Sequence, residues 1–194
     1  AHQPNLFTGP LYFIYKIAHA IALSRSLNKQ IPGAHFVPVY YMGSEDADLE
    51  EASNLAVQGS YKNSGQRCTA VKRMLVHDKV ADAFTEMVLA KTRAWTYGDP
   101  RDEANLMGTV IDEAAAKLFE SRVLEAVSQG ARLLVGNQRQ GALYAPTVLD
   151  RVRPEMTLVR EETFGPVSPI IRFANIDEAI RIANGTAYGL SSGV

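Results

Sequence analysis

Cys68 is the only cysteine among the 194 residues, and it lies in the stretch NSGQRCTA, residues 63–70. The thiolate is the nucleophilic form of a cysteine, and an adjacent cation such as Arg67 can favour that form. Gly65 permits a tight turn, which would present the next residues at the edge of a sheet. A lone cysteine is also among the most frequently buried residues. The residues alone therefore leave two interpretations of Cys68 open, a nucleophile and an inert core residue.

The usual partners of a catalytic or metal-binding cysteine are not evident nearby. His77 lies nine residues after Cys68, beyond a predicted strand. We expect this histidine at the surface, pointing away from the thiol, and not as the base of a cysteine–histidine pair. One cysteine and four scattered histidines show no ligand spacing, so we expect no metal site. The sequence contains no GxGxxG or Walker-type glycine loop.

A second stretch of interest is VREETFGPV, residues 159–167, where two adjacent carboxylates precede an aromatic ring and a Gly-Pro turn. Such a pair is commonly a solvated acidic turn. A carboxylate held at the entrance of a strand could instead accept hydrogen bonds from a ribose diol, as acidic residues do in dinucleotide sites. The glycine-rich stretch NGTAYGLSSGV, residues 184–194, is typical of a loop.

Composition narrows the class of protein. An apolar fraction of 46% and a charged fraction of 21% are typical of a globular protein. The net charge of −1 and the absence of a basic stripe argue against nucleic acid or membrane partners. The most apolar early run, residues 10–23, is interrupted by Lys16 and His19 and is too short to span a bilayer. One cysteine cannot form an internal disulfide, so we expect a reducing, cytoplasmic setting.

These residues must be positioned by helices and strands, and the apolar periodicity predicts both. A stripe at helical spacing, including Leu49, Ala52, Leu55 and Ala56, predicts a helix from Asp46 to Gly59. Further helices are predicted over residues 11–27 (mostly buried), 80–95, 111–129 and 176–183, and strands over residues 36–42, 70–76, 132–135 and 167–173. Asn175 and Glu178 form a plausible capping box for the last helix. The alternation predicts an α/β fold with a largely parallel sheet.

Charge is distributed unevenly along the chain. The first 44 residues contain no Asp or Glu, and all 21 acidic residues follow from Glu45 onwards. The same 44 residues hold seven of the 16 aromatic residues. A shift of this kind indicates either a domain boundary or a buried N-terminal segment.

Taken together, the motifs resemble the aldehyde dehydrogenase superfamily over residues 46–194. The resemblance is carried by DADLEEASNLAVQGSYKNSGQRCTAVKRMLVH, MGTVID, GALYAPTVLD, EETFGPVSPIIRF and ANGTAYGLSSGV, in that order. The form GQRCTA is most similar to members that act on phosphonate- or phosphate-bearing aldehydes, namely phosphonoacetaldehyde dehydrogenase and non-phosphorylating glyceraldehyde-3-phosphate dehydrogenase. The resemblance implies a partial catalytic domain of this family, with an aldehyde as its small-molecule partner.

The resemblance also implies roles for individual residues. Cys68 matches the catalytic nucleophile, which passes through a thiohemiacetal and a thioester during NAD(P)-dependent oxidation. Glu162 matches the glutamate that holds the nicotinamide ribose, and Phe164 matches the aromatic residue near that ring. Arg67 would pair with an anionic substrate tail, since guanidinium matches phosphate geometry. NAD and NADP are not distinguished.

Parts of the family pattern have no counterpart in this sequence. The glycine-rich turn and the lysine that contact the cofactor are not found. The position of the general-base glutamate falls near Gly33 and Ala34, in QIPGAHF, with no glutamate in reach. We therefore expect impaired turnover, and a non-catalytic α/β fragment stays open as an alternative.

Residues 1–45 resemble a different family, the cysteine-adding enzyme of bacillithiol synthesis. That resemblance is carried by TGPLY followed by YK, and by VPV followed by EDADLEE. It predicts a chimera whose foreign helix and strand, residues 1–45, join the dehydrogenase part, residues 46–194, within EDADLEEA, residues 45–52. A cysteine-adding ligase is therefore a second functional alternative. A helix displaced from its own fold would expose an apolar face, so we expect self-association.

Overall fold

The computed structural model describes residues 22–23, 25–27, 29–30 and 49–189. Of the helix predicted over residues 11–27, the described residues 22–23 and 25–27 are helical, as are residues 29–30. Leu23 is 50% exposed, which differs from the expected burial and agrees with the polar sequence SRSLNKQ that follows it. The rest of this helix and the strand predicted over residues 36–42 lie outside the described residues. The chain divides into two units, and the larger, Asp48–Gly189, carries every element below.

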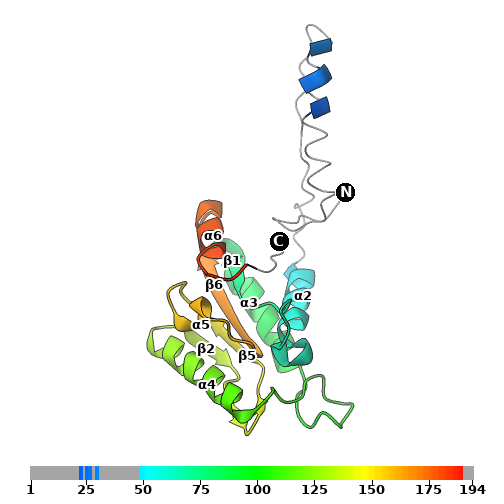
Figure 1. The fold of residues 1–194 in the computed structure, drawn as a ribbon, viewed down its shortest axis with the longest axis vertical. Helices are drawn as coiled ribbons and strands as arrows, with labels where there is room; N and C mark the ends of the chain where they lie inside the picture. Colours follow the sequence, from blue (N-terminus) through cyan, green and yellow to red (C-terminus); the bar gives the residue numbers. More distant parts are fainter. Residues whose placement is uncertain (1–21, 24, 28, 31–48, 190–194) are drawn as a thin grey trace. The chain divides into compact units, whose positions relative to one another are not determined.

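A four-stranded sheet in the order β1-β6-β5-β2 forms the centre of this unit (Figure 1). Its strands are β1 (Met74–His77), β6 (Val167–Phe173), β5 (Thr147–Asp150) and β2 (Arg132–Val135). β6 pairs in parallel with both β1 and β5, whereas β2 pairs antiparallel with β5 at the edge. The prediction of an α/β fold with a largely parallel sheet is therefore confirmed, with β2 as the antiparallel exception.

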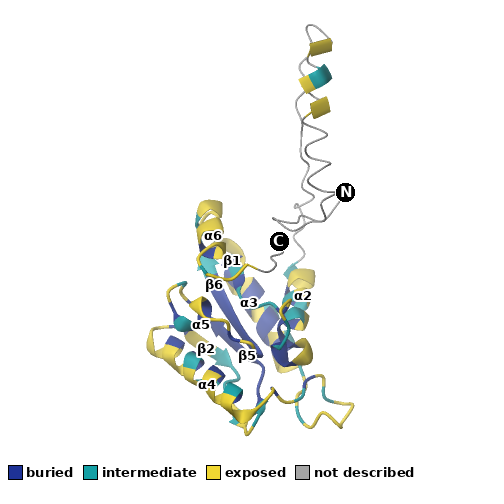
Figure 2. Ribbon diagram, viewed as in Figure 1, coloured by how far each residue is buried: buried dark blue, intermediate teal, exposed yellow. Residues whose placement is uncertain are grey.

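Helices cover both faces of the sheet. α2 (Leu49–Tyr61) and α3 (Asp78–Arg93) pack on one face, where Val148 of β5 and Ile170 of β6 are fully buried. α4 (Glu113–Ser128), the short α5 (Thr157–Arg160) and α6 (Ile176–Ala183) lie on the other face. Figure 2 shows the buried residues concentrated between these layers. A small hairpin of β3 (Arg139–Gln140) and β4 (Leu143–Tyr144) adjoins α4.

Local sequence signals account for many element ends. Asp112 caps α4 by accepting a hydrogen bond from the Ala115 N–H at 2.7 Å, and Gly130, with φ +103°, follows the end of that helix. Asn175 accepts from the Glu178 N–H at 3.0 Å, as predicted for the start of α6. The predicted bounds of β2, β6 and α6 are those of the structure. None of the described helices has the length and apolar character needed to cross a membrane.

The buried face of α2 differs from the predicted stripe. Leu55, on that stripe, is 57% exposed, whereas Val57 and Tyr61 are buried. The hydroxyl of Tyr61 donates to the Thr147 carbonyl at 3.3 Å and accepts from the Ser168 hydroxyl at 3.0 Å. A buried hydroxyl needs such partners. The hydrogen bonds of the buried Tyr61 hydroxyl therefore account for the side of α2 that faces the sheet.

β1 starts later than predicted. The sequence predicts a strand over residues 70–76, but pairing with β6 begins at Met74. The preceding residues leave the sheet because the Val71 N–H bonds back to the Gly59 carbonyl of α2 at 3.2 Å. This departure leaves residues 70–73 as a connection between the cysteine turn and the sheet.

Candidate functional site

Cys68 lies in a turn between α2 and β1. α2 is followed by the short 3₁₀ segment Lys62–Gly65, in which three consecutive residues have positive φ, including Gly65 at +67°. A second turn follows, closed by a 3.1 Å hydrogen bond from the Ala70 N–H to the Arg67 carbonyl. Cys68 occupies the tip of this second turn as an exposed free thiol. The tight turn predicted at Gly65 is confirmed, and the interpretation of Cys68 as a core residue is wrong.

Gly65 touches the loop of the second predicted motif. A Cβ atom placed on Gly65 would lie 2.4 Å from the Gly165 carbonyl oxygen and 2.8 Å from that of Ser60. Real Cβ atoms essentially never approach this closely, so only glycine fits. The two motifs NSGQRCTA and EETFGPV are therefore brought into direct contact at Gly65 and Gly165, one hundred residues apart.

Lys72 is a functional candidate that the sequence reasoning did not single out. Its ammonium donates to the Gly65 carbonyl at 2.5 Å and lies 4.6 Å from the ring centroid of Phe164. Burial lowers the pKa of Lys72 to about 8, and the charge of Arg67 adds to this effect while that of Glu162 opposes it. No local signal distinguishes this lysine from a surface lysine, because the ring that it contacts, Phe164, lies more than ninety residues away.

Arg67 is directed toward the end of α2. Its Nη2 donates to the Gly59 carbonyl at 3.0 Å, and its Nε is buried without a partner among the described residues. The guanidinium thus satisfies part of the helix terminus, where carbonyl groups lack intrahelical partners. Its expected pairing with a substrate anion stays a prediction.

The predicted cofactor loop, residues 161–165, is anchored to α4 at two adjacent residues. Arg122 of α4 donates through Nη1 to the Glu162 carbonyl at 2.7 Å and to the Thr163 hydroxyl at 3.0 Å. Thr163 is buried, whereas the side chains of Glu162 and Phe164 are exposed. The anchored backbone therefore leaves a carboxylate and an aromatic ring accessible on the same loop.

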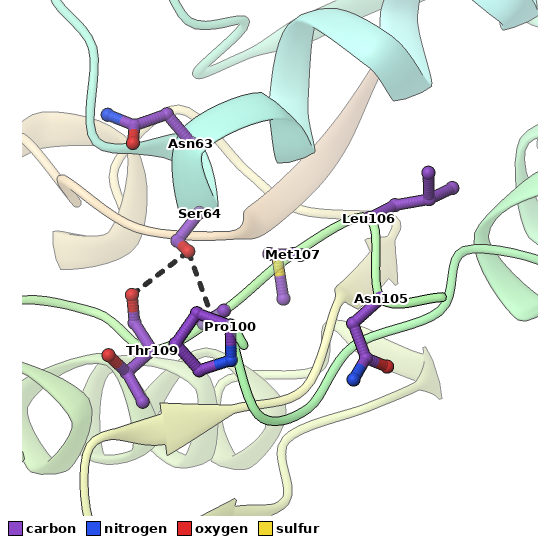
Figure 3. Close-up of a pocket in the computed structure, with 8 residues that line it drawn as sticks. Asn63, Ser64, Pro100, Asn105, Leu106, Met107 and Thr109 are labelled. Atoms are coloured by element: carbon purple, nitrogen blue, oxygen red, sulfur yellow. Dashed lines mark hydrogen bonds between the residues drawn. The ribbon is translucent and has the colours of Figure 1, made fainter. Parts of the chain in front are cut away.

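A pocket of about 350 Å³ opens beside the start of the cysteine turn (Figure 3). The hydroxyl of Ser64 hydrogen-bonds to the Gly108 and Thr109 carbonyls, each at 3.1 Å. These bonds attach the motif MGTVID, residues 107–112, to the same turn. The lining residues are Asn63, Ser64, Pro100, Asn105, Leu106, Met107, Gly108 and Thr109. Cys68 is not among them, so the pocket adjoins the nucleophile's turn without containing the thiol.

His77 has a structural role at the end of β1. Its Nδ1 accepts from the Lys79 N–H at 3.1 Å and caps α3, and its ring contacts Phe173 edge-on at 5.4 Å between centroids. The position predicted for this histidine, at a strand end, is confirmed. Within the described ranges, no three His, Cys, Asp or Glu residues are arranged to hold a metal ion.

Comparisons with known proteins find relatives over most of the chain. A model of the aldehyde dehydrogenase family matches residues 40–194. Sulfoacetaldehyde dehydrogenase from Neptuniibacter caesariensis is 39% identical over 150 residues, covering 77% of this chain and 33% of that protein. NADP-dependent glyceraldehyde-3-phosphate dehydrogenase from Streptococcus equinus is 44% identical over 150 residues, covering 77% and 31%. The chain spans about a third of the length of these relatives.

A solved structure shares the fold. The glyceraldehyde-3-phosphate dehydrogenase GapN from Methanocaldococcus jannaschii, crystallised with NADP, superimposes with a TM-score of 0.72 at 41% identity. The match covers 75% of this chain and 32% of that one. The family match begins six residues before the boundary expected at residue 46, and residues 1–39 lie outside it.

Proposed function

Because the chain belongs to the aldehyde dehydrogenase family, we propose that it carries the nucleophile of an NAD(P)-dependent aldehyde oxidation, and that Cys68 is that nucleophile. The observation that supports this most directly is the contact between Gly65 and Gly165, bridged by Lys72. It places an exposed thiol and a loop with an accessible carboxylate and aromatic ring on neighbouring turns. Neither local sequence motif requires this proximity by itself.

The chemistry assigned to Cys68 is covalent catalysis. The thiolate attacks the aldehyde carbon, and a C–S bond forms while the carbonyl oxygen becomes the oxyanion of a thiohemiacetal. The Cys68 N–H donates no hydrogen bond within the described residues, so it is available to hold that oxyanion. The carbon then loses a hydride and becomes a thioester. Water hydrolyses the thioester, releasing the acid and regenerating the thiol.

The residues of the cofactor loop fit a nicotinamide nucleotide. Bound NAD or NADP would supply the hydride acceptor. The exposed carboxylate of Glu162 can accept hydrogen bonds from a ribose diol. The ring of Phe164 is 37% exposed beside it, and it offers an apolar surface to a planar ring. Arg122 holds the loop backbone from behind, so both side chains project from a fixed support.

For the substrate, we propose an aldehyde with an anionic tail such as a phosphonate, phosphate or sulfonate. Arg67 precedes the nucleophile, and only its Nη2 has a partner that the structure records. A guanidinium has five donors in a planar fork, so further donors remain for an oxyanion. The names of the two relatives above, a sulfoacetaldehyde and a glyceraldehyde-3-phosphate dehydrogenase, support this class.

The proposal is tested first at the thiol. We expect iodoacetamide to label Cys68 at neutral pH much faster than it labels a free cysteine in an unstructured peptide, and Cys68→Ala to abolish the labelling. A rate equal to that of the peptide would support the alternative of a non-catalytic fragment.

Turnover is tested second, by following the reduced cofactor in the presence of an anionic aldehyde. We expect little or no steady-state turnover, because the general-base glutamate of the family has no counterpart in this sequence. Robust production of reduced cofactor by the chain, lost in Cys68→Ser, would disprove the expected impairment while supporting Cys68 as the nucleophile.

For residues 1–39, which lie outside the family match, the chimera and the cysteine-adding ligase remain proposals. One long sequencing read across codons 30–70 tests the join, and separate reads without a spanning read would show it to be an artefact. We place the protein in the cytoplasm, where a single thiol stays reduced.

We also propose self-association, on the basis of exposed apolar side chains that include Leu55 and Leu124. Light scattering tests this directly, and a monodisperse monomer would contradict it.

A further inference from the structure

We propose that Lys72 is a positioning residue that joins the turn carrying Cys68 to the loop carrying Glu162 and Phe164. This inference rests on the proposed function, in which the turn holds the nucleophile and the loop holds the cofactor. It concerns a residue for which the resemblance implied no role. The evidence lies in the contacts of one ammonium group with both segments.

The ammonium of Lys72 has partners on each side. On the turn, it donates to the Gly65 carbonyl at 2.5 Å. On the loop, it lies over the ring of Phe164 at 4.6 Å from the centroid, within the range of a cation–π interaction. Lys72 itself belongs to the connection that precedes β1, and the backbone of its neighbour Val71 is bonded to Gly59 of α2. One side chain therefore contacts both the turn and the loop.

The bond to Gly65 satisfies a buried group. Gly65 is buried, and its carbonyl accepts from the Lys72 ammonium. A buried carbonyl left without a donor is costly, so removing the Lys72 amine favours separation of the two segments and entry of water. An aliphatic side chain of similar length would fill the space of Lys72 but could not donate to this carbonyl.

Glu162 and Arg67 are the charged groups that act on Lys72. Glu162 attracts the ammonium from the loop, and Arg67 repels it from the turn. The attraction favours an arrangement in which the loop approaches the lysine. Arg67 itself is directed toward Gly59, to whose carbonyl it donates at 3.0 Å.

The loop has a separate anchor on its other side. Arg122 of α4 binds the Glu162 carbonyl and the Thr163 hydroxyl, and neither bond involves Lys72. Loss of Lys72 should therefore leave the loop attached to α4 but free to move relative to the cysteine turn. The expected consequence is a change in the separation between Cys68 and Phe164, with little change in the fold.

That separation can be measured without any catalytic assay. Cys68 is the only thiol, so a bimane fluorophore can be attached to it alone. Phe164→Trp introduces a short-range quencher that presents an even better face to a cation. Cys68 lies three residues after Gly65, a span of at most about 11 Å, so contact quenching between the label and the loop is within reach. Quenching by Trp95 is removed by comparison with labelled chain that retains Phe164.

Four labelled Phe164→Trp proteins are compared: one with no further change and one each with Lys72→Met, Lys72→Arg and Lys62→Met. We expect Lys72→Met to reduce quenching by roughly half or more, as the contact population falls. Lys72→Arg keeps a cation and donors and should restore quenching toward the parent. Lys62→Met removes an exposed lysine of the same turn region and should leave quenching unchanged.

Unchanged quenching in a folded Lys72→Met protein would overturn the proposal, as would an equal loss in Lys62→Met. If Lys72→Met shows no cooperative melting transition, Lys72→Gln takes its place. Its amide keeps a donor but removes the cation over the ring at position 164, so a smaller loss of quenching is expected, and unchanged quenching would again overturn the inference. Because Cys68 is blocked by the label, failure here is separate from failure of the proposed function, which is tested by thiol reactivity and turnover.

Discussion

Gly65 offers the sharpest test of how the site is assembled, through the paired variants Gly65→Ala and Gly141→Ala. Both glycines have a positive φ, +67° and +59°, so alanine is strained by the backbone at each. They differ in the space around them. A Cβ at Gly65 would lie 2.4 Å from the Gly165 carbonyl oxygen, whereas a Cβ at Gly141 would meet nothing within 4 Å.

The expected loss of stability has two contributions, strain in the backbone and close contact of the new Cβ atom. The left-handed conformation costs alanine about 1–2 kcal/mol relative to a permitted one, and this term applies to both variants. Overpacking adds about 1–3 kcal/mol where backbone must shift, and this term applies only to Gly65, because Gly165 and Ser60 present carbonyl oxygens and not flexible side-chain ends. We therefore expect the free energy of unfolding to fall by about 2–5 kcal/mol in Gly65→Ala and by about 1–2 kcal/mol in Gly141→Ala.

Urea denaturation followed by circular dichroism measures both changes, with the midpoint and slope compared to those of the parent chain. The structure also predicts a consequence at the thiol: alanine at Gly65 pushes the turn from the Gly165 loop, so the iodoacetamide rate of Cys68 should change in this variant and stay constant in Gly141→Ala. Equal destabilisation of the two variants, within about 0.5 kcal/mol, would refute the argument that close approach to Gly165 requires glycine.

Two further predictions concern buried charge and its dependence on pH. Arg172→Met should destabilise the chain by about 3–5 kcal/mol, because it leaves the carboxylate of Asp150, 3% exposed, without its two-pronged partner; Arg101→Met, which breaks an exposed pair with Asp99, should have far less effect. Burial opposes ionisation of Asp150, but its bonds from Arg172 and the Arg151 N–H outweigh this and lower its pKa, so the stabilisation is present above the ordinary pKa near 4 and is lost as the pH falls through the folded value. The difference in the free energy of unfolding between the parent and Arg172→Met should therefore become smaller in acid. A difference that stays constant with pH would contradict the stabilisation of the Asp150 carboxylate by Arg172. For Lys72, burial lowers the pKa to about 8. Keeping the buried ammonium charged therefore reduces the free energy of unfolding below pH 8, and this cost disappears as the pH rises toward the ordinary pKa of about 10.4. The free energy of unfolding of the parent should rise relative to that of Lys72→Met between these pH values, and parallel curves would contradict the burial of this ammonium.

Many elements of this fold could be predicted because their signals are local. β6 and α6 have the predicted bounds, since a run of apolar residues and the cap at Asn175 both act within a few residues of the chain. Gly65 was recognised as a turn residue for the same reason, because a positive φ is a property of one residue and its neighbours. Cys68 and Glu162 were singled out by residue type and by the order of motifs.

Other features have no local signal. β5 was not predicted, because its four residues carry too little periodicity, and its burial comes from β6 and β2 on either side. The orientation of α2 follows the partners of the Tyr61 hydroxyl, which lie 86 and 107 residues away. The antiparallel direction of β2 likewise depends on its pairing with β5.

The sequence by itself therefore determined the chemical groups: one thiol, a glycine that permits its turn, and a carboxylate and ring ahead of a strand. Only the tertiary structure decided that the turn and the loop that carry these groups lie against each other. The Gly65–Gly165 contact and the position of Lys72 depend on how the sheet brings the start of β1 beside the start of β6. Parallel pairing places those two ends at the same edge of the sheet, and no property of either segment alone specifies that pairing.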